Sequence, residues 1–119
     1  MALRNVRLEL ARCTEFPEGS PNHGYEFVAP LANSGRFDAQ EWKGAHDKCT
    51  VRRFWGAAPE EHGKLIHRRD AWAFSYVSGS DADDEPIFKL DRHVMKPGEY
   101  VSITEHDGVQ RTFRVAAVG

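Results

Sequence analysis

The sequence lacks a long apolar run, and only two of its 119 residues are cysteines. A membrane-spanning helix needs about 20 consecutive apolar residues, so the chain predicts no membrane span. The first residues also lack the apolar core of a secretory signal peptide. We therefore expect a soluble, cytoplasmic protein in which Cys13 and Cys49 are reduced thiols rather than a disulfide.

The sequence also lacks the short motifs that mark many catalytic and cofactor sites. It has no glycine-rich phosphate loop, no Gly-x-Ser-x-Gly elbow, no Cys-x-x-Cys pair and no His-Glu-x-x-His. Zinc is usually bound by several such ligands at a recognisable spacing. We therefore expect no cofactor and no metal ion, and a function that is not enzymatic.

Six histidines still leave a metal hypothesis open. Its best form would use His46 and Cys49, which are three residues apart and could share a helix face, with a distant histidine. Cys49 is also the candidate for a cysteine nucleophile, with Lys48 and Arg52 nearby to favour the thiolate. It follows a predicted helix, however, and the helix dipole raises the pKa of a thiol there. Surface histidines and a small, partly buried thiol are the simpler interpretation.

Length and composition indicate one folded domain over residues 1–119. A chain of this length buries roughly two-thirds of the surface that its unfolded state exposes, which is enough for a core without disulfides. Three Trp and seven Phe supply large side chains for that core, while charged residues make up 29% of the chain. This balance is typical of a globular protein and argues against long disordered segments.

Alternating apolar and polar residues predict many short strands. Val6, Leu8 and Leu10 alternate with other residues in the first of them, and similar segments recur to the end of the chain. Dense turn-forming residues predict loops over 17–24 and 56–61. We therefore expect a mainly β fold, an antiparallel barrel or sandwich of about seven or eight short strands. The barrel is favoured because closure hides the strand edges.

One short helix is predicted near residues 39–48. Asp38 and Glu41 have the spacing of a capping box, in which a carboxylate accepts from exposed backbone N–H groups. A negative charge at Asp38 also suits the positive end of the helix dipole. Trp42 and Ala45 would supply the apolar stripe that packs the helix against the sheet.

The last segment, residues 96–118, predicts a C-terminal β-hairpin. A two-residue Asp-Gly turn would place apolar residues opposite polar ones and leave the hairpin without an apolar face. A three-residue loop over 106–108 instead pairs Val101 with Phe113, and it puts Gly108 at the left-handed position of a bulge. We predict this second register. Its apolar face consists of Val101, Ile103, Phe113 and Val115.

Residues 71–77 predict a strand with one aromatic face, formed by Trp72, Phe74 and Tyr76. As core, this face would pack against the apolar face of the hairpin. As a site, it would be an exposed platform or a subunit interface. We favour the core, because a chain of this size needs large side chains inside.

The net charge of −2 conceals an uneven distribution of charge. Residues 43–69 hold seven basic and three acidic residues, a net charge of +4. Basic residues beside aromatic ones suit an anionic partner, because the cations contact phosphates and the rings stack on bases. The candidate ligand-binding residues are Arg52, Arg53, Trp55, Lys64, His67, Arg68 and Arg69.

Three hypotheses of function therefore stand. The leading one is a non-enzymatic binding module that uses segment 52–69 and takes a nucleic acid or an acidic protein segment as partner. The second is a homo-oligomer that pairs through a strand edge and exposed aromatic residues. The third is an enzyme whose His and Cys residues meet only in the folded chain. An isoelectric point near 6.3 counts against a dedicated nucleic-acid binder.

Overall fold

The computed structural model describes residues 3–68, 71–76, 85–88, 94–105 and 108–119. Over these ranges the chain forms eight strands, one α-helix and a short 3-10 helix. The elements are β1 (Leu3–Leu10), β2 (Ser20–Pro30), α1 (Ala39–Ala45), η1 (His46–Lys48), β3 (Thr50–Trp55), β4 (Ala58–Arg68), β5 (Ala71–Tyr76), β6 (Glu85–Phe88), β7 (Tyr100–Thr104) and β8 (Gln110–Val118).

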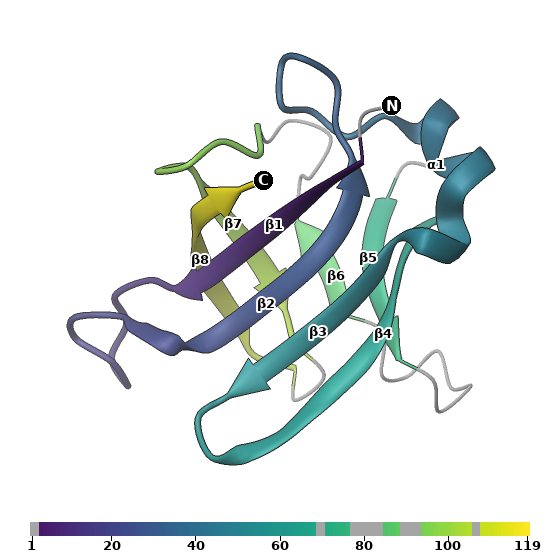
Figure 1. Ribbon diagram of the computed structural model, residues 1–119. Helices are drawn as coiled ribbons and strands as arrows, with labels where there is room; N and C mark the ends of the chain where they lie inside the picture. Colours follow the sequence, from purple (N-terminus) through teal and green to yellow (C-terminus); the bar gives the residue numbers. More distant parts are fainter. Residues whose placement is uncertain (1–2, 69–70, 77–84, 89–93, 106–107) are drawn as a thin grey trace.

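The described strands pair antiparallel in sequence order and close into a barrel (Figure 1). β1 pairs with β2 on one side and with β8 on the other. Each of the described strands thus has two neighbours, and none of them presents a free edge. The prediction of a mainly β, antiparallel fold with one short helix is confirmed, in its barrel form.

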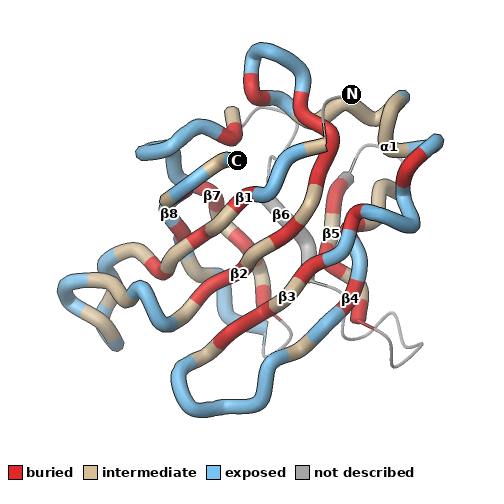
Figure 2. Tube along the Cα trace, viewed as in Figure 1, coloured by how far each residue is buried: buried red, intermediate tan, exposed pale blue. Residues whose placement is uncertain are grey.

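Inward-pointing aromatic side chains fill the barrel. Figure 2 shows buried positions recurring along β1, β2 and β3. The ring centroid of Tyr25 lies 5.0 Å from that of Phe74 and 5.2 Å from that of Phe113. Phe27 lies 5.1 Å from Phe74. Eight-stranded barrels are just wide enough for side chains to fill the interior, so rings from β2, β5 and β8 meet across it.

The aromatic face of β5 belongs to this core, as predicted. Trp72, Phe74 and Tyr76 are all buried, and so are the four apolar residues of the hairpin face. The alternative of an exposed aromatic platform on β5 is therefore wrong. Burying one large apolar side chain stabilises a fold by about 1.5–3 kcal/mol, so these residues contribute strongly to stability.

Helix α1 begins where the capping residues predict. The side chain of Asp38 accepts a hydrogen bond from the backbone N–H of Glu41 at 3.1 Å. The α-helix ends at Ala45, and the 3-10 turn η1 completes the predicted span. The indole Nε1 of Trp42 donates to the backbone oxygen of Leu65 at 2.9 Å. This contact holds α1 at the end of the barrel where β2 ends and β3 begins (Figure 1).

The C-terminal hairpin has the predicted register. Val101 pairs with Phe113, and Ile103 pairs with Arg111 rather than with Thr112. The backbone N–H of Glu105 donates to the oxygen of Val109, which closes a loop over 106–108. The backbone of Gly108 is left-handed, with φ 82°. Residues 106 and 107 themselves lie outside the described residues.

Two segments predicted as loops belong in part to strands. Residues 20–24 form the start of β2, and residues 58–61 form the start of β4. In the barrel, His23 pairs with Trp55 and Glu61 pairs with Arg53. Pairing with a neighbouring strand outweighs the local preference of Gly, Pro and Asn for turns, because strand propensity depends on context.

Gly24 provides a test of how tightly the strands are packed. A Cβ atom at this position would lie 1.9 Å from the backbone oxygen of Leu8. We expect Gly24→Ala to lower the free energy of unfolding by about 2 kcal/mol or more, because backbone must move. Gly44→Ala is the control, since it has open space in α1 and should stabilise by about 0.5–1 kcal/mol. Urea denaturation of both variants measures the difference, and equal stabilities would contradict this packing.

Candidate functional site

The predicted site residues lie on opposite faces of β3 and β4. Arg52 and Lys64 point outward, whereas Arg53 is buried and Trp55 is half-buried. His67 is half-buried and lies near α1. The side chain of Arg68 and the whole of Arg69 lie outside the described residues. The seven positions therefore do not form one continuous patch within the described part of the chain.

The outward residues surround a hollow on the surface of β3 and β4. Its volume is about 360 Å³. Lys64 lies directly opposite Thr50, and Arg52 lies directly opposite His62. The hollow thus brings two cations, a histidine and a hydroxyl group together. It is lined by Thr50, Val51, Arg52, His62, Gly63 and Lys64.

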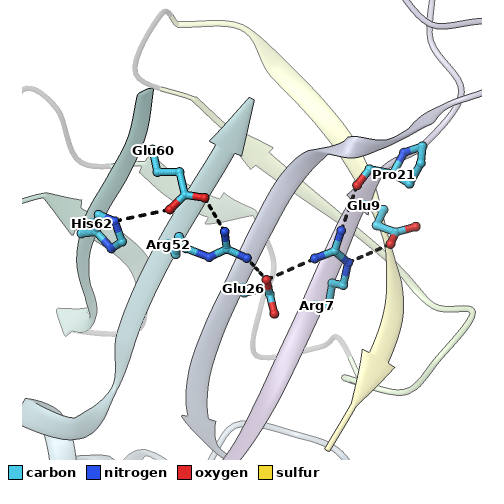
Figure 3. A network of polar contacts seen from close by, with 7 residues as sticks. All are labelled: Arg7, Glu9, Pro21, Glu26, Arg52, Glu60 and His62. Carbon is cyan, nitrogen blue, oxygen red and sulfur yellow. Dashed lines mark hydrogen bonds and ion pairs between the residues drawn. The ribbon is translucent and has the colours of Figure 1, made fainter. Parts of the chain in front are cut away.

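Arg52 is also part of a row of ion pairs on the outside of the barrel. The row crosses β8, β1, β2, β3 and β4, and all of it except Arg114 is drawn in Figure 3. Positive and negative side chains alternate along it, and several of them are direct cross-strand neighbours. Such opposed pairs stabilise a sheet by about 0.2–1 kcal/mol each. In order, the row is Arg114, Glu9, Arg7, Glu26, Arg52, Glu60 and His62.

Phe54 forms the apolar floor beneath this row. The guanidinium carbons of Arg7 and Arg52 lie 4.5 and 5.1 Å from the centre of its ring. Phe54 is buried although it points outward, because the two guanidinium groups cover it. The guanidinium group of Arg52, predicted to bind a ligand, therefore already interacts with Glu26, Glu60 and this ring within the protein.

Arg53 belongs to a buried polar cluster at the opposite end of the barrel from α1. Its Nε donates to Oε2 of Glu105 at 3.0 Å, and Nη1 of Arg111 donates to Oε1 at 2.7 Å. The hydroxyl of Tyr25 donates to Oε2 at 2.6 Å. The side chain of Glu105 is fully buried, and those of Arg53 and Arg111 are only 10% and 11% exposed. Three donors thus satisfy one buried carboxylate.

Within this cluster, neighbouring groups favour the charged form of Arg53. Burial disfavours the charged form of Arg53, but the carboxylate of Glu105 and the hydroxyl of Tyr25 outweigh burial and raise the pKa of the guanidinium. At the rim, Glu61 accepts from Arg53 at 3.2 Å and Glu15 accepts from Arg111 at 3.2 Å. Each arginine therefore joins the buried carboxylate to an exposed one, and the cluster closes this end of the barrel.

Trp55 covers the cluster from the side. The guanidinium carbons of Arg53 and Arg111 lie 4.3 and 5.3 Å from its ring centre. The imidazole of His23 meets the Trp55 ring edge-on at 4.6 Å, and its Nδ1 is hydrogen-bonded to Ser20 Oγ at 2.7 Å. Burial lowers the pKa of His23, and the charge of Arg53 lowers it further. Trp55 is thus enclosed by protein groups rather than presented to a ligand.

His67 lies at the end of the barrel beneath α1, far along β4 from the cluster. Its ring lies 4.3 Å from Trp72 and 5.9 Å from Trp42. Trp42 also contacts His46, whose side chain is exposed. This group is a set of packed rings in which His67 is half-buried.

Cys49 is a buried thiol whose environment disfavours the thiolate. Burial raises its pKa, and the charges of Asp47 and Glu41 raise it further. Its Sγ donates to the backbone oxygen of Ala45 at 3.5 Å. The helix dipole predicts the same direction, whereas burial is the main cause of the raised pKa. Among the described residues, no group of three or more His, Cys, Asp and Glu side chains is placed to hold a metal ion.

Comparisons with protein-family models, with curated proteins and with solved structures found no match to this chain. None of the described helices has the length and apolar character needed to cross a membrane.

Sequence reasoning missed three members of the buried cluster, namely Tyr25, Glu105 and Arg111. Glu105 follows a strand and precedes the predicted loop, and a carboxylate at such a position is expected to be exposed to solvent. Arg111 lies two residues from Phe113 on β8, so the two side chains share one face of the strand. The available signal was this alternation: the predicted register turns Phe113 toward the core, and Arg111 therefore faces the inside of the barrel as well.

The buried cluster predicts a large stability difference between two glutamates. Glu105→Gln should lower the free energy of unfolding by about 3 kcal/mol or more, because two buried guanidinium groups lose their shared carboxylate. Glu61→Gln removes a partner of Arg53 at the rim, where 36% of the glutamate is exposed, and should cost less than about 1 kcal/mol. Urea denaturation measures both values. Similar losses in the two variants would contradict the description of the cluster.

The two thiols should react at very different rates. We expect a thiol reagent at neutral pH to modify Cys13 in the folded protein, while Cys49 reacts only after unfolding, because it is buried and its pKa is raised. Absorbance of the released reagent anion follows the reaction. Cys49→Ser should leave the fast phase unchanged, and Cys13→Ser should remove it. Fast labelling of Cys49 in the folded Cys13→Ser variant would overturn this expectation.

Proposed function

We propose that this protein is a non-enzymatic binding module that contacts an anionic partner through the outer face of β3 and β4. The contact is centred on Lys64, with Arg52 and His62 beside it. Within segment 52–69, the proposed contact is thus limited to these three side chains, which line the same hollow. Arg53 and Trp55 take no part, because the buried cluster holds them.

Lys64 is the single observation that carries the proposal. It is exposed, it lines the hollow, and within the described part of the chain it forms no ion pair. Arg52 is held in place by two glutamates, so it presents a fixed guanidinium beside the freer ammonium group. A fixed donor and a mobile cation around a concave surface favour an acidic group of a partner.

Three further features support a binding module over the other hypotheses. The described strands have no free edge, so two copies of the protein have no edge strand through which to pair. The aromatic residues of β5 are buried and cannot form a subunit interface. The one buried cysteine has a raised pKa, which disfavours a thiolate nucleophile.

A charge reversal at Lys64 tests the proposal. Fluorescence anisotropy would follow binding of labelled single-stranded oligothymidine and of labelled polyglutamate at low ionic strength. We expect at least one probe to bind with strong salt dependence, and Lys64→Glu to weaken that binding about tenfold. The two probes separate a nucleic acid from an acidic protein segment as the partner.

Lys96→Glu is the matched control, because Lys96 is also exposed but lines a different hollow with Arg4 and Leu31. It should change the affinity by less than about twofold. If neither probe binds at low salt, the proposal fails. It also fails if the two charge reversals weaken binding equally, because that result indicates attraction by overall charge alone.

A further inference from the structure

A second hollow on the barrel lies away from β3 and β4, over β1, β7 and β8. Its volume is about 650 Å³. One wall is the connection between β1 and β2, which the backbone N–H of Ala11 ties to the oxygen of Thr112 at 3.0 Å. Within that connection Cys13 and Phe16 exchange two backbone hydrogen bonds, and Gly19 donates to Phe16. The wall is therefore held by its own hydrogen bonds as well as by β8.

An aromatic ring stands exposed in this hollow. Tyr100 is 54% exposed, the highest value among the large apolar and aromatic residues of the described part. It lies directly opposite Arg114 on β8, and Arg114 lies opposite Glu9 on β1. Thr112 lies next along β8 and also lines the hollow. A ring, a guanidinium group, a carboxylate and a hydroxyl group thus follow one another across three strands.

The charges around the hollow are balanced. Glu9 and Glu18 supply two carboxylates, and Arg12 and Arg114 supply two guanidinium groups. Arg12 and Glu18 form no ion pair with another described residue. One oxygen of Glu9 is paired with Arg7 at 2.8 Å, whereas the contact of its other oxygen with Arg114 is long, at 3.9 Å. The glutamates would repel an anionic ligand, and the arginines would repel a cationic ligand. Both polar types remain able to bind groups that donate and accept hydrogen bonds.

We propose that this hollow binds a neutral carbohydrate chain. A sugar hydroxyl both donates and accepts, so it can pair with the carboxylates, the guanidinium groups and Thr112 without carrying a charge. The C–H face of a pyranose ring is apolar, and Tyr100 offers an exposed flat surface of matching size with a polar tip. Ligand sites commonly combine such an aromatic surface with a few fixed polar groups.

This second surface is independent of the proposed anion-binding face. The two hollows share no residue, and they take partners of different chemistry. Loss of one binding activity would therefore leave the other unchanged.

The experiment is an NMR titration of the full chain with neutral oligosaccharides. The probes are maltohexaose, cellohexaose, laminarihexaose and chitohexaose, each added up to about 10 mM, which detects binding as weak as millimolar. We expect at least one probe to shift the amide signals of Gly19, Thr112 and Arg114. Tyr100→Ala should reduce its affinity about tenfold, whereas Tyr100→Phe, which keeps the ring, should reduce it less.

Val109→Ala is the matched control, because Val109 is the other exposed large apolar residue in the described part of the chain and it does not line the hollow. It should leave the affinity unchanged, and the dispersion of the amide signals verifies that each variant is folded. The proposal is overturned if no probe shifts these signals, or if Tyr100→Ala binds as tightly as the unmodified protein.

Discussion

Pairing between β1 and β8 is the constraint on which the rest of the structure depends. These strands come from the two ends of the described chain, and their ladder runs from Val6 opposite Val118 to Leu10 opposite Phe113. Asn5 and Gly119 add two backbone hydrogen bonds beyond it. Because this pairing completes the ring, it fixes the width of the interior. The aromatic rings of β2, β5 and β8 can then meet across it.

Closure also decides how the charged residues are used. Arg52 and Arg53 are adjacent in sequence, yet one joins the outer row of ion pairs and the other binds a buried carboxylate. The outer pairs are exposed and each contributes little. The inner cluster replaces the lost hydration of Glu105 with three hydrogen bonds, so loss of any partner would leave a buried charge unsatisfied. Its main effect is to close one end of the barrel.

Because these charged residues pair with one another, two surfaces of different character remain available to a partner. On β3 and β4, Lys64 remains exposed beside arginine side chains that are already paired. Over β1, β7 and β8, an exposed tyrosine stands among balanced charges in a larger hollow. Both surfaces sit on paired strands, so their side chains are held at fixed spacings. A filled barrel of this kind offers its outside, rather than its interior, for binding.

The sequence by itself determined the elements of the fold. The alternation of Val6, Leu8 and Leu10, the cap at Asp38 and the apolar face of the final hairpin each follow from neighbouring residues, because side-chain direction and capping are local properties. Only the tertiary structure decided which charges remain free. Glu105 meets Arg53 across 52 positions and Tyr25 across 80, and no local pattern records such pairs. Burial and charge pairing are settled only when the barrel closes. For this reason the sequence of segment 52–69 predicts one basic patch, whereas its side chains lie on two opposite faces of the folded sheet.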